Sequence, residues 1–362
     1  MEKIHWLLIL VPISLAVRYL APGHGTLIFA LSAASMIPLA KLLSDATEQL
    51  ASRLGPALGA LLNVTFGNAG ELVIGYFALQ AGLNRLVKAS IAGSLLVNLL
   101  LTLGLSMLTA GLRKKTLSFN PLAARTSTTM LMLAAISLIL PAGFSYLGGA
   151  AARAKVIDLS LEFSLVLLVM YGLSLLFTLG THQRLLTPRR RPESEPAESV
   201  WSLPRALGIL TLSALFVGWM GEVLVGSIEA ASGALGMTEL FAGLVVVAVA
   251  GNAAESTAAV RAALQNRMDL SVGIAVGSSI QVALFVGPLL VLVGHWVGTR
   301  NMDLVFTPIE IVAVVLAIVI TEQVASDGDA NWLEGAQLMA VYIMLAVIFF
   351  YLPESNPAGR GH

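Results

Sequence analysis

The chain has no cysteine and carries little charge. Its 362 residues include 21 Lys and Arg and 21 Asp and Glu, so only 12% are charged and the formal net charge is zero. The absence of cysteine excludes structural disulfides, thiolate nucleophiles and thiolate metal sites. The balanced charge provides no net field to attract nucleic acid. Average soluble chains carry roughly 25% charged residues, so this composition excludes a cytosolic enzyme, a secreted disulfide-linked domain and a disordered scaffold.

Apolar residues are abundant instead, and they occur in long runs. Hydrophobic residues make up 57% of the chain and the mean hydropathy is +0.86. A membrane-spanning helix needs about 20 mostly apolar residues. We therefore predict an all-α integral membrane protein with about eleven transmembrane helices. The predicted spans are 5–20, 26–52, 56–82, 87–112, 124–144, 158–181, 204–235, 238–265, 269–298, 307–326 and 332–352.

A polar stretch from His182 to Ser202 divides the chain into halves. The predicted units are a first transmembrane helix (1–25), a five-helix repeat (26–182), a cytoplasmic linker (183–203), a second five-helix repeat (204–353) and a C-terminal tail (354–362). The first apolar segment could instead be a signal-peptide core, but no small-residue cleavage site follows it, which favours a retained span. Lys and Arg are more numerous in the loops on the linker side, which predicts that the N-terminus and the linker are cytoplasmic.

An internal repeat relates residues 67–104 to residues 251–288 at a constant offset of 184. Each copy contains Gly-Asn-Ala-x-Glu followed, at the same later spacing, by Gly-Ser. An odd number of spans in each unit makes the second unit enter the membrane from the opposite side. This inverted-topology repeat is the architecture of many secondary transporters. The matching pairs are Gly67 and Gly251, Asn68 and Asn252, Glu71 and Glu255, Gly93 and Gly277, and Ser94 and Ser278.

Two carboxylates, Glu71 and Glu255, lie near the middle of long apolar segments. A charge at that depth costs at least ~2.5–3.5 kcal/mol, so such residues normally face a cavity and have a partner. The alternative is a protonated Glu that only holds neighbouring helices together, but a pair related by the repeat favours a functional site. Gly and Asn one turn earlier weaken each helix, so we expect a break that frees backbone carbonyls. Close helix packing is the alternative role of these glycines.

The spans that follow add hydroxyl and amide groups. Asn98 lies four residues after Ser94, and Gln281 lies three after Ser278, so each amide shares a helix face with its serine. All of these ligands are hard oxygens, which suit Ca²⁺ better than Zn²⁺ or Cu⁺. Two carboxylates can be neutralised by one Ca²⁺ or by two protons, because burial and mutual repulsion favour protonation once the cation leaves. This competition predicts electroneutral exchange of one Ca²⁺ for two protons.

Two further carboxylates, Glu48 and Glu229, lie late in the spans that precede the two motif spans. Their positions fit either gating and proton-relay roles or interfacial anchors near span ends.

The two repeat segments resemble those of the cation/proton exchanger (CAX) branch of the Ca²⁺/cation antiporter superfamily. GNAGELVIGYFAL and GNAAESTAAVRAALQNRMDLSVGIAVGSSIQVALFVGP resemble the two family motifs, with further matches in ATEQLASRLG (46–55) and ASDGDANWLEG (325–335). The resemblance implies that the motif glutamates bind Ca²⁺ and exchange it for protons by alternating access. It also implies one helix outside a five-plus-five repeat, with the second and seventh spans sliding. The implied ligands are Glu71, Glu255, carbonyls near Gly67, Asn68, Gly251 and Asn252, and the side chains of Ser94, Asn98, Ser278 and Gln281.

Two departures from the family pattern are visible. Ser256 occupies the position where many members have His, and the linker is too short for the acidic helix of eukaryotic members. The compact length is typical of a prokaryotic plasma-membrane protein.

The leading prediction is therefore a Ca²⁺/H⁺ antiporter with Ca²⁺ and protons as substrates and the bilayer as its solvent. No resident cofactor and no nucleic-acid partner are expected, and the oligomeric state is left open. Exchange of Na⁺, K⁺ or Mn²⁺ for protons on the same fold is the nearest alternative. A glutamate-lined cation channel fits less well, because channels usually repeat in parallel around a pore. The chain shows no Ser/Lys pair or HExxH motif, so no intramembrane hydrolase is expected.

Overall fold

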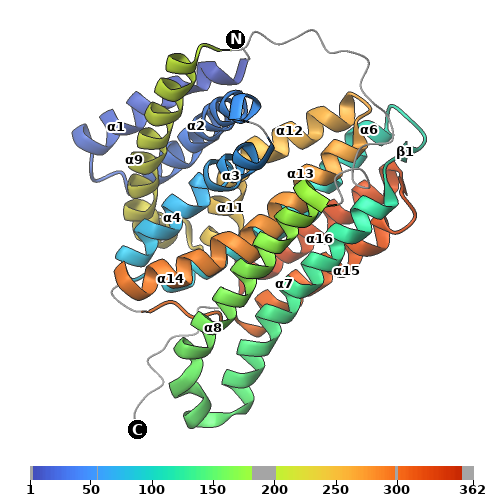
Figure 1. Cartoon of the computed structure of the whole chain (residues 1–362). Helices are drawn as coiled ribbons and strands as arrows, with labels where there is room; N and C mark the ends of the chain where they lie inside the picture. The colour runs from blue at the N-terminus through green and yellow to red at the C-terminus, as the bar shows by residue number, and fades with distance from the viewer. Residues whose placement is uncertain (1–2, 55, 182–200, 298–300, 353–362) are drawn as a thin grey trace.

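The computed structural model describes residues 3–54, 56–181, 201–297 and 301–352, and these are almost entirely helical (Figure 1). The predicted linker 183–203 lies outside the described residues except for 201–203, and the predicted tail 354–362 lies outside them completely. The helices of the first half are η1 (Lys3–Ile9), α1 (Leu10–Leu20), α2 (Gly25–Leu54), α3 (Pro56–Gly67), α4 (Ala69–Gln80), α5 (Asn84–Leu96), η2 (Val97–Thr102), α6 (Leu103–Gly111), α7 (Pro121–Leu147), α8 (Gly149–Leu176) and η3 (Phe177–Thr181). Those of the second half are α9 (Leu203–Leu235), α10 (Glu239–Phe241), η5 (Ala242–Val247), α11 (Ala248–Gly251), α12 (Ala253–Leu264), α13 (Met268–Gln281), η6 (Val282–Val286), α14 (Gly287–Val297), α15 (Pro308–Ala325) and α16 (Trp332–Tyr351).

The predicted number of eleven spans is not confirmed by helix length and composition. Within the described residues, eight helices are long and apolar enough to cross a membrane, or nine if one bent pair counts as a single span. The predicted span 56–82 is divided into α3 and α4, of 12 residues each, by a break at Asn68. The first predicted span is a 3₁₀ turn followed by a short helix, so neither segment meets the length of a regular span.

Four interrupted segments form the centre of the bundle: α3–α4, α5–η2–α6, α10–η5–α11–α12 and α13–η6–α14. On one side, α2 packs along α9 and also contacts α3, α11 and α12, with α1 outside it (Figure 1). On the other side, α7 and α8 pack against α13, α14 and α15, while α16 packs on α6. The motif helices are thereby enclosed by uninterrupted helices, which leaves the broken backbone inside the protein, as membrane depth requires.

The backbone repeats as the sequence predicts. Asn68 and Asn252, related by the offset of 184, both leave the helical conformation, with φ/ψ of −103°/22° and −93°/11°. The axes before and after Asn252 differ by 56°. The predicted break at each Gly-Asn pair is confirmed. The repeat also continues beyond the motifs, because Gly82 and Asn266 occupy equivalent left-handed turns at φ 75° and 63°, a conformation open mainly to Gly and Asn.

Three π-helical segments lie beside the motif residues, and the sequence analysis did not predict them. The segment η2 follows Ser94 and contains Asn98, and η6 follows Gln281 at the equivalent position in the second repeat. The third, η5, precedes the Gly251–Asn252 break. Single π turns are frequent at functional sites, because they displace side chains and leave backbone carbonyls for other partners.

A small two-stranded sheet adds to the all-α prediction. Strand β1 (Leu117–Ser118) pairs antiparallel with β2 (Asp329–Ala330), with Leu117 opposite Ala330. It joins the loop before α7 to the loop before α16. Both loops also end in side-chain caps: Asn120 accepts from the first amides of α7, and Asn331 forms a capping box with Glu334 in α16.

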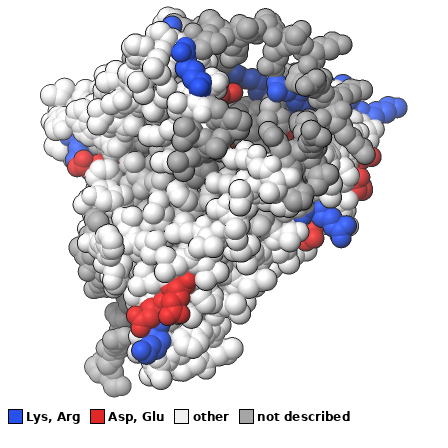
Figure 2. All heavy atoms as spheres, viewed as in Figure 1, with Lys and Arg blue, Asp and Glu red and all other residues white. Residues whose placement is uncertain are grey.

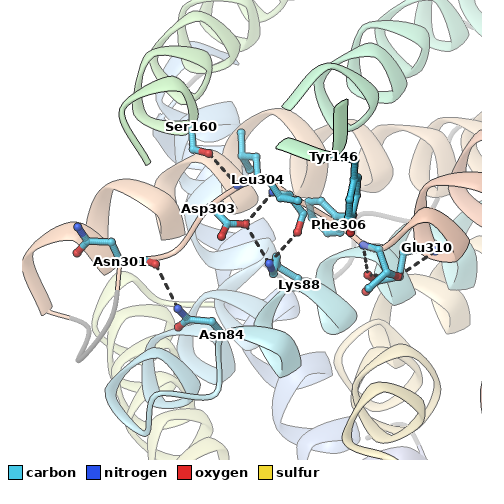
Figure 3. Close-up of polar contacts among 11 residues, drawn as sticks. Asn84, Lys88, Tyr146, Ser160, Asn301, Asp303, Leu304, Phe306 and Glu310 are labelled. Carbon is cyan, nitrogen blue, oxygen red and sulfur yellow. Dashed lines mark hydrogen bonds and ion pairs between the residues drawn. The ribbon is translucent and has the colours of Figure 1, made fainter. Parts of the chain in front are cut away.

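Residues 301–307, which lead into α15, are fixed to the first repeat (Figure 3). The Lys88 ammonium lies 3.0 Å from Asp303 Oδ1 and donates to the carbonyl of Val305 at 2.7 Å. The amide of Leu304 donates to Ser160 Oγ of α8 at 3.0 Å. Glu310 is 2% exposed and accepts from Thr307 in the capping box that begins α15. These contacts bind α5 and α8 of one repeat to the start of α15 in the other.

The outer surface has the character expected of a protein in lipid. Figure 2 shows a broad uncharged surface between charged groups near the margins of the molecule. Large apolar side chains are exposed along the outer helices, including Leu165, Val166, Val169 and Leu173 on α8. In water such an extended apolar surface would be unfavourable, so its presence supports the membrane assignment.

Close helix packing makes Gly93 a sensitive position. A Cβ at Gly93 would overlap the backbone of Leu244 in η5, with the Leu244 Cα only 2.7 Å away. We predict that Gly93→Ala lowers the free energy of unfolding by about 1–3 kcal/mol, the usual cost of overpacking. The matched control is Gly277→Ala at the equivalent position, where a Cβ meets nothing within 4 Å. Thermal melting of the purified protein measures both, and equal melting temperatures for the two variants would contradict the prediction.

Candidate cation-binding site

The two Gly-Asn-Ala-x-Glu motifs meet inside the bundle, each at its helix break, at Asn68 or Asn252. The helices α4 and α12 begin one residue after these breaks, and each carries its glutamate in the first turn, as Glu71 and Glu255. A helix N-terminus presents unpaired amide groups and favours a negative charge. The backbone therefore provides partial compensation for each carboxylate inside the bundle.

The Asn252 side chain links the two repeats. Its amide nitrogen donates to Ser94 Oγ at 2.8 Å and to the carbonyl of Ala248 at 2.8 Å. Its Oδ1 accepts from the amide nitrogen of Asn98 at 2.9 Å. Asn252 and Asn98 are fully buried, and Ser94 is 1% exposed. Ser278 joins the same network, because Asn98 also donates to its hydroxyl at 3.1 Å.

A second amide pair crosses between the repeats. Asn68 donates to Gln281 Oε1 at 2.6 Å. This contact and the Asn252 network bring together six of the predicted ligands, namely Asn68, Asn252, Ser94, Asn98, Ser278 and Gln281. The bonds of Asn68 and of Asn252 with Ser94 and Asn98 each join a motif segment of one repeat to the following span of the other, and the Asn98–Ser278 bond joins the two following spans. Which atoms bind a cation stays a prediction, as do the roles of the backbone carbonyls near Gly67 and Gly251.

The two glutamates lie at the same junction. Glu71 is 9% exposed, and a Cβ placed on Gly251 would lie 3.5 Å from Glu71 Oε1. The first repeat's carboxyl group is thus seated against the second repeat's Gly-Asn break. A Cβ there would lie at ordinary van der Waals distance from the carboxyl group, so Gly251 marks how closely the two repeats approach at this point. Gly67 lies instead beside its own helix, where a Cβ would be 3.4 Å from Asn63 Oδ1.

Two buried oxygens at the junction have no hydrogen-bond partner in the structure. They are Glu255 Oε2 and Asn98 Oδ1. A buried acceptor without a donor is costly, and nearly all such atoms in proteins are paired. A bound cation or a proton would satisfy them. The surrounding groups are carboxylates, amides and hydroxyls, a hard-oxygen set suited to Ca²⁺ as the transported substrate.

The structure adds the hydroxyl groups of Thr102 and Thr321, which the sequence analysis missed. Thr102 Oγ1 and Ser256 Oγ are 2.5 Å apart, again across the repeats. Thr321 of α15 donates to the carbonyl of Leu99 in η2 at 3.4 Å. A sequence signal existed for Thr102, because it lies four residues after Asn98 and hence on the same helix face. Thr321 had no such signal, since it lies far along the chain from either motif.

Glu48 on α2 and Glu229 on α9 are not part of this junction. Both side chains are exposed. The two helices nevertheless pack along each other, and α2 reaches the site through Met36, whose Cε would be 3.8 Å from a Cβ on Gly70. A gating or relay role for the two glutamates stays a prediction.

Known proteins provide an independent comparison. A family model described as sodium/calcium exchanger protein matches residues 24–180 and 205–351. A protein named Ca(2+)/H(+) antiporter from Aphanothece halophytica is 41% identical over 362 aligned residues, covering 96% of each chain. The Ca(2+)/H(+) antiporter ChaA of Bacillus subtilis is 39% identical, covering 97% of this chain and 100% of its own. A solved structure titled native YfkE aligns with a TM-score of 0.81 at 36% identity, covering 96% of this chain and 100% of its own.

Asn252→Ala should destabilise the junction. It removes the amide that donates to Ser94 and one of the two acceptors of Asn98, and a buried polar group left unpaired costs about 1–3 kcal/mol. We expect a clear fall in the melting temperature of the purified protein. Ser279→Ala is the matched control, because that buried hydroxyl bonds only its own helix at Ala275, and such bonds contribute little. A variant at Asn252 as stable as the Ser279 control would show that the amide network does not hold the repeats together.

Proposed function

This chain belongs to the sodium/calcium exchanger protein family, and from that membership we propose that it exchanges Ca²⁺ for protons across a membrane. Relatives at about 40% identity over the full length carry the name Ca(2+)/H(+) antiporter. The residues of the site support the same activity, because its donors are hard oxygens and its only charged members are carboxylates. The transport role follows from the family, and the choice of Ca²⁺ and protons from the relatives together with this site.

The observation that carries the proposal is the meeting of one glutamate from each repeat at a shared junction. Glu71 lies against Gly251, and Glu255 presents a buried oxygen without a partner. Two negative charges confined in an apolar bundle are unfavourable unless a cation or protons neutralise them. One Ca²⁺ or two protons meet that requirement equally, and the two states exclude each other. We infer electroneutral exchange of one Ca²⁺ for two protons.

Exchange also requires the site to face each side in turn. The four central segments are joined to one another by the amide network, whereas α2 and α9 pack over them as uninterrupted helices of 30 and 33 residues. Close contacts on glycine give these helices smooth surfaces to move along: a Cβ on Gly221 of α9 would lie 2.9 Å from Val73 of α4. We infer that α2 and α9 move as a pair relative to the central segments.

The location follows from charge and from the relatives. We propose a prokaryotic plasma membrane, with the N-terminus and the segment between α8 and α9 on the cytoplasmic side. Basic residues on that side outnumber those on the other, which is the usual bias of cytoplasmic loops.

Replacement of either central glutamate tests the proposal. Glu71→Gln and Glu255→Gln keep the size of the side chain but remove its charge, so each should reduce exchange to background. The assay is ⁴⁵Ca²⁺ uptake into sealed proteoliposomes under an imposed pH gradient. Glu162→Gln is the matched control, since Glu162 is an exposed carboxylate on α8, away from the junction. Wild-type rates in either central variant would remove the paired glutamates from the mechanism.

The same proteoliposomes measure which cation the protein transports. Uptake that follows the pH gradient and ignores Na⁺ supports Ca²⁺/H⁺ exchange. If folded protein transports Na⁺, K⁺ or Mn²⁺ but not Ca²⁺, the proposed substrate is wrong, while the fold and the role of the paired glutamates are retained. Flux that follows voltage without proton coupling would instead indicate a channel.

A further inference from the structure

A recess opens between α6 and α12 and reaches Ser256, the residue after Glu255. It has a volume of about 360 Å³ and is lined by Leu105 of α6 and by Ser256, Thr257, Val260, Arg261 and Leu264 of α12. A second recess of about 140 Å³ shares Leu264 and continues past Ala110 to Arg113 and Lys114. The two helices lie beside each other in Figure 1, and both end on the same face of the molecule. The two recesses adjoin at Leu264, and we call them together the α6–α12 groove.

The inner end of this groove is polar. Ser256 lines the recess and also contacts the fully buried Thr102, with 2.5 Å between the hydroxyl oxygens. Ser256 directly follows Glu255, whose Oε2 is buried without a partner. One hydroxyl from each repeat thus meets at the end of the recess, and one of them belongs to the residue next to Glu255.

The equivalent positions in the other half of the repeat are apolar. At the offset of 184, Ser256 corresponds to Leu72 and Thr102 to Val286. The matching helix pair, α4 and α14, is also closely packed. A Cβ at Gly75 of α4 would lie only 2.5 Å from Leu290 of α14, and Val73, the counterpart of Thr257, packs on Gly221 of α9. The two flanks thus differ in the polarity of these positions and in how closely the neighbouring helices pack, while Leu72 and Val73 are half-buried like Ser256 and Thr257.

We propose that Thr102 and Ser256 form a polar door through which the central site exchanges its cation with water in the α6–α12 groove. The proposal rests on the function proposed above and adds its access route on this face. A cation leaving water needs oxygen ligands to replace its hydration shell, and hydroxyl groups supply them. Leucine and valine cannot, so the flank formed by Leu72 and Val286 is a barrier in this conformation. The door opens when the single hydroxyl-to-hydroxyl contact separates.

Chemical accessibility tests the door without relying on transport. The chain has no native cysteine, so a single introduced thiol is a specific probe. Two matched pairs compare the flanks: Ser256→Cys with Leu72→Cys, and Thr257→Cys with Val73→Cys. Each variant is reconstituted in lipid nanodiscs, which expose both faces, and treated with a charged, water-soluble methanethiosulfonate reagent. Intact-protein mass spectrometry gives the labelling rates, and a monodisperse size-exclusion profile confirms folding.

We expect the thiols at 256 and 257 to react at least tenfold faster than those at 72 and 73. Equal rates within both pairs, or faster labelling at 72 and 73, would overturn the proposal. The second pair decides the matter if a variant of the first fails to fold. Faster labelling at 256 and 257 in a protein that transports no Ca²⁺ would support the proposed access route and contradict Ca²⁺ as the substrate. The two proposals can therefore fail separately.

Discussion

The rest of the structure depends on the hydrogen bonds that the side-chain amide of Asn252 makes between the two repeats. This amide bonds Ser94 and Asn98 of the other repeat while its own helix is interrupted at that residue. Inside a bilayer, polar side chains cannot form hydrogen bonds with water, so their partners must come from the protein. The interrupted helices consequently cannot separate without leaving several buried groups unpaired. This requirement fixes the distance between the repeats, and the glutamates are placed by it.

The apolar part of the bundle follows from the same arrangement. Helices that exchange side-chain hydrogen bonds must approach closely, and glycines at the crossings permit this. Gly93 meets the backbone of Leu244 in η5, and Gly104 meets Gly335 where α6 crosses α16. The segment 301–307 completes the assembly, because Lys88 and Ser160 of the first repeat hold it before α15 begins. The central and outer helices form a cross-linked unit, against which α2 and α9 are the separable elements.

The sequence predicted the centre of the protein better than its periphery. The offset of 184 related Glu71 to Glu255 and located both helix breaks, because Gly-Asn pairs have direct backbone consequences. The offset also paired Ser94 with Ser278, and helix spacing placed Asn98 and Gln281 on the same faces as these serines. The structure brings all four residues to the junction. Hydropathy alone gave 56–82 as one span, and the break within it was predicted from the Gly67–Asn68 pair. The contact of β1 with β2 and that of Thr321 with Leu99 depend on tertiary packing, which local patterns do not encode. The exposed orientation of Glu48 and Glu229 depends on helix rotation, which span-level reasoning leaves undetermined.

The positions of η2 and η6 bear on how the two repeats arose, whereas η5 has no counterpart because residues 58–63 lie within the α-helix α3. A π turn contains one residue more than an α turn, and one residue corresponds to about 100° of helix rotation. In η2 the amide of Leu103 bonds the carbonyl of Asn98, five residues earlier, and in η6 the amide of Gly287 bonds that of Val282 in the same way. Subtracting 184 from 282–286 gives 98–102, which lies within Val97–Thr102. The extra residue sits at the same place in both halves, so the simplest order of events is that it entered an ancestral single repeat before the gene duplicated. The two halves have since diverged in side chains, while this irregularity of the backbone has been kept in both.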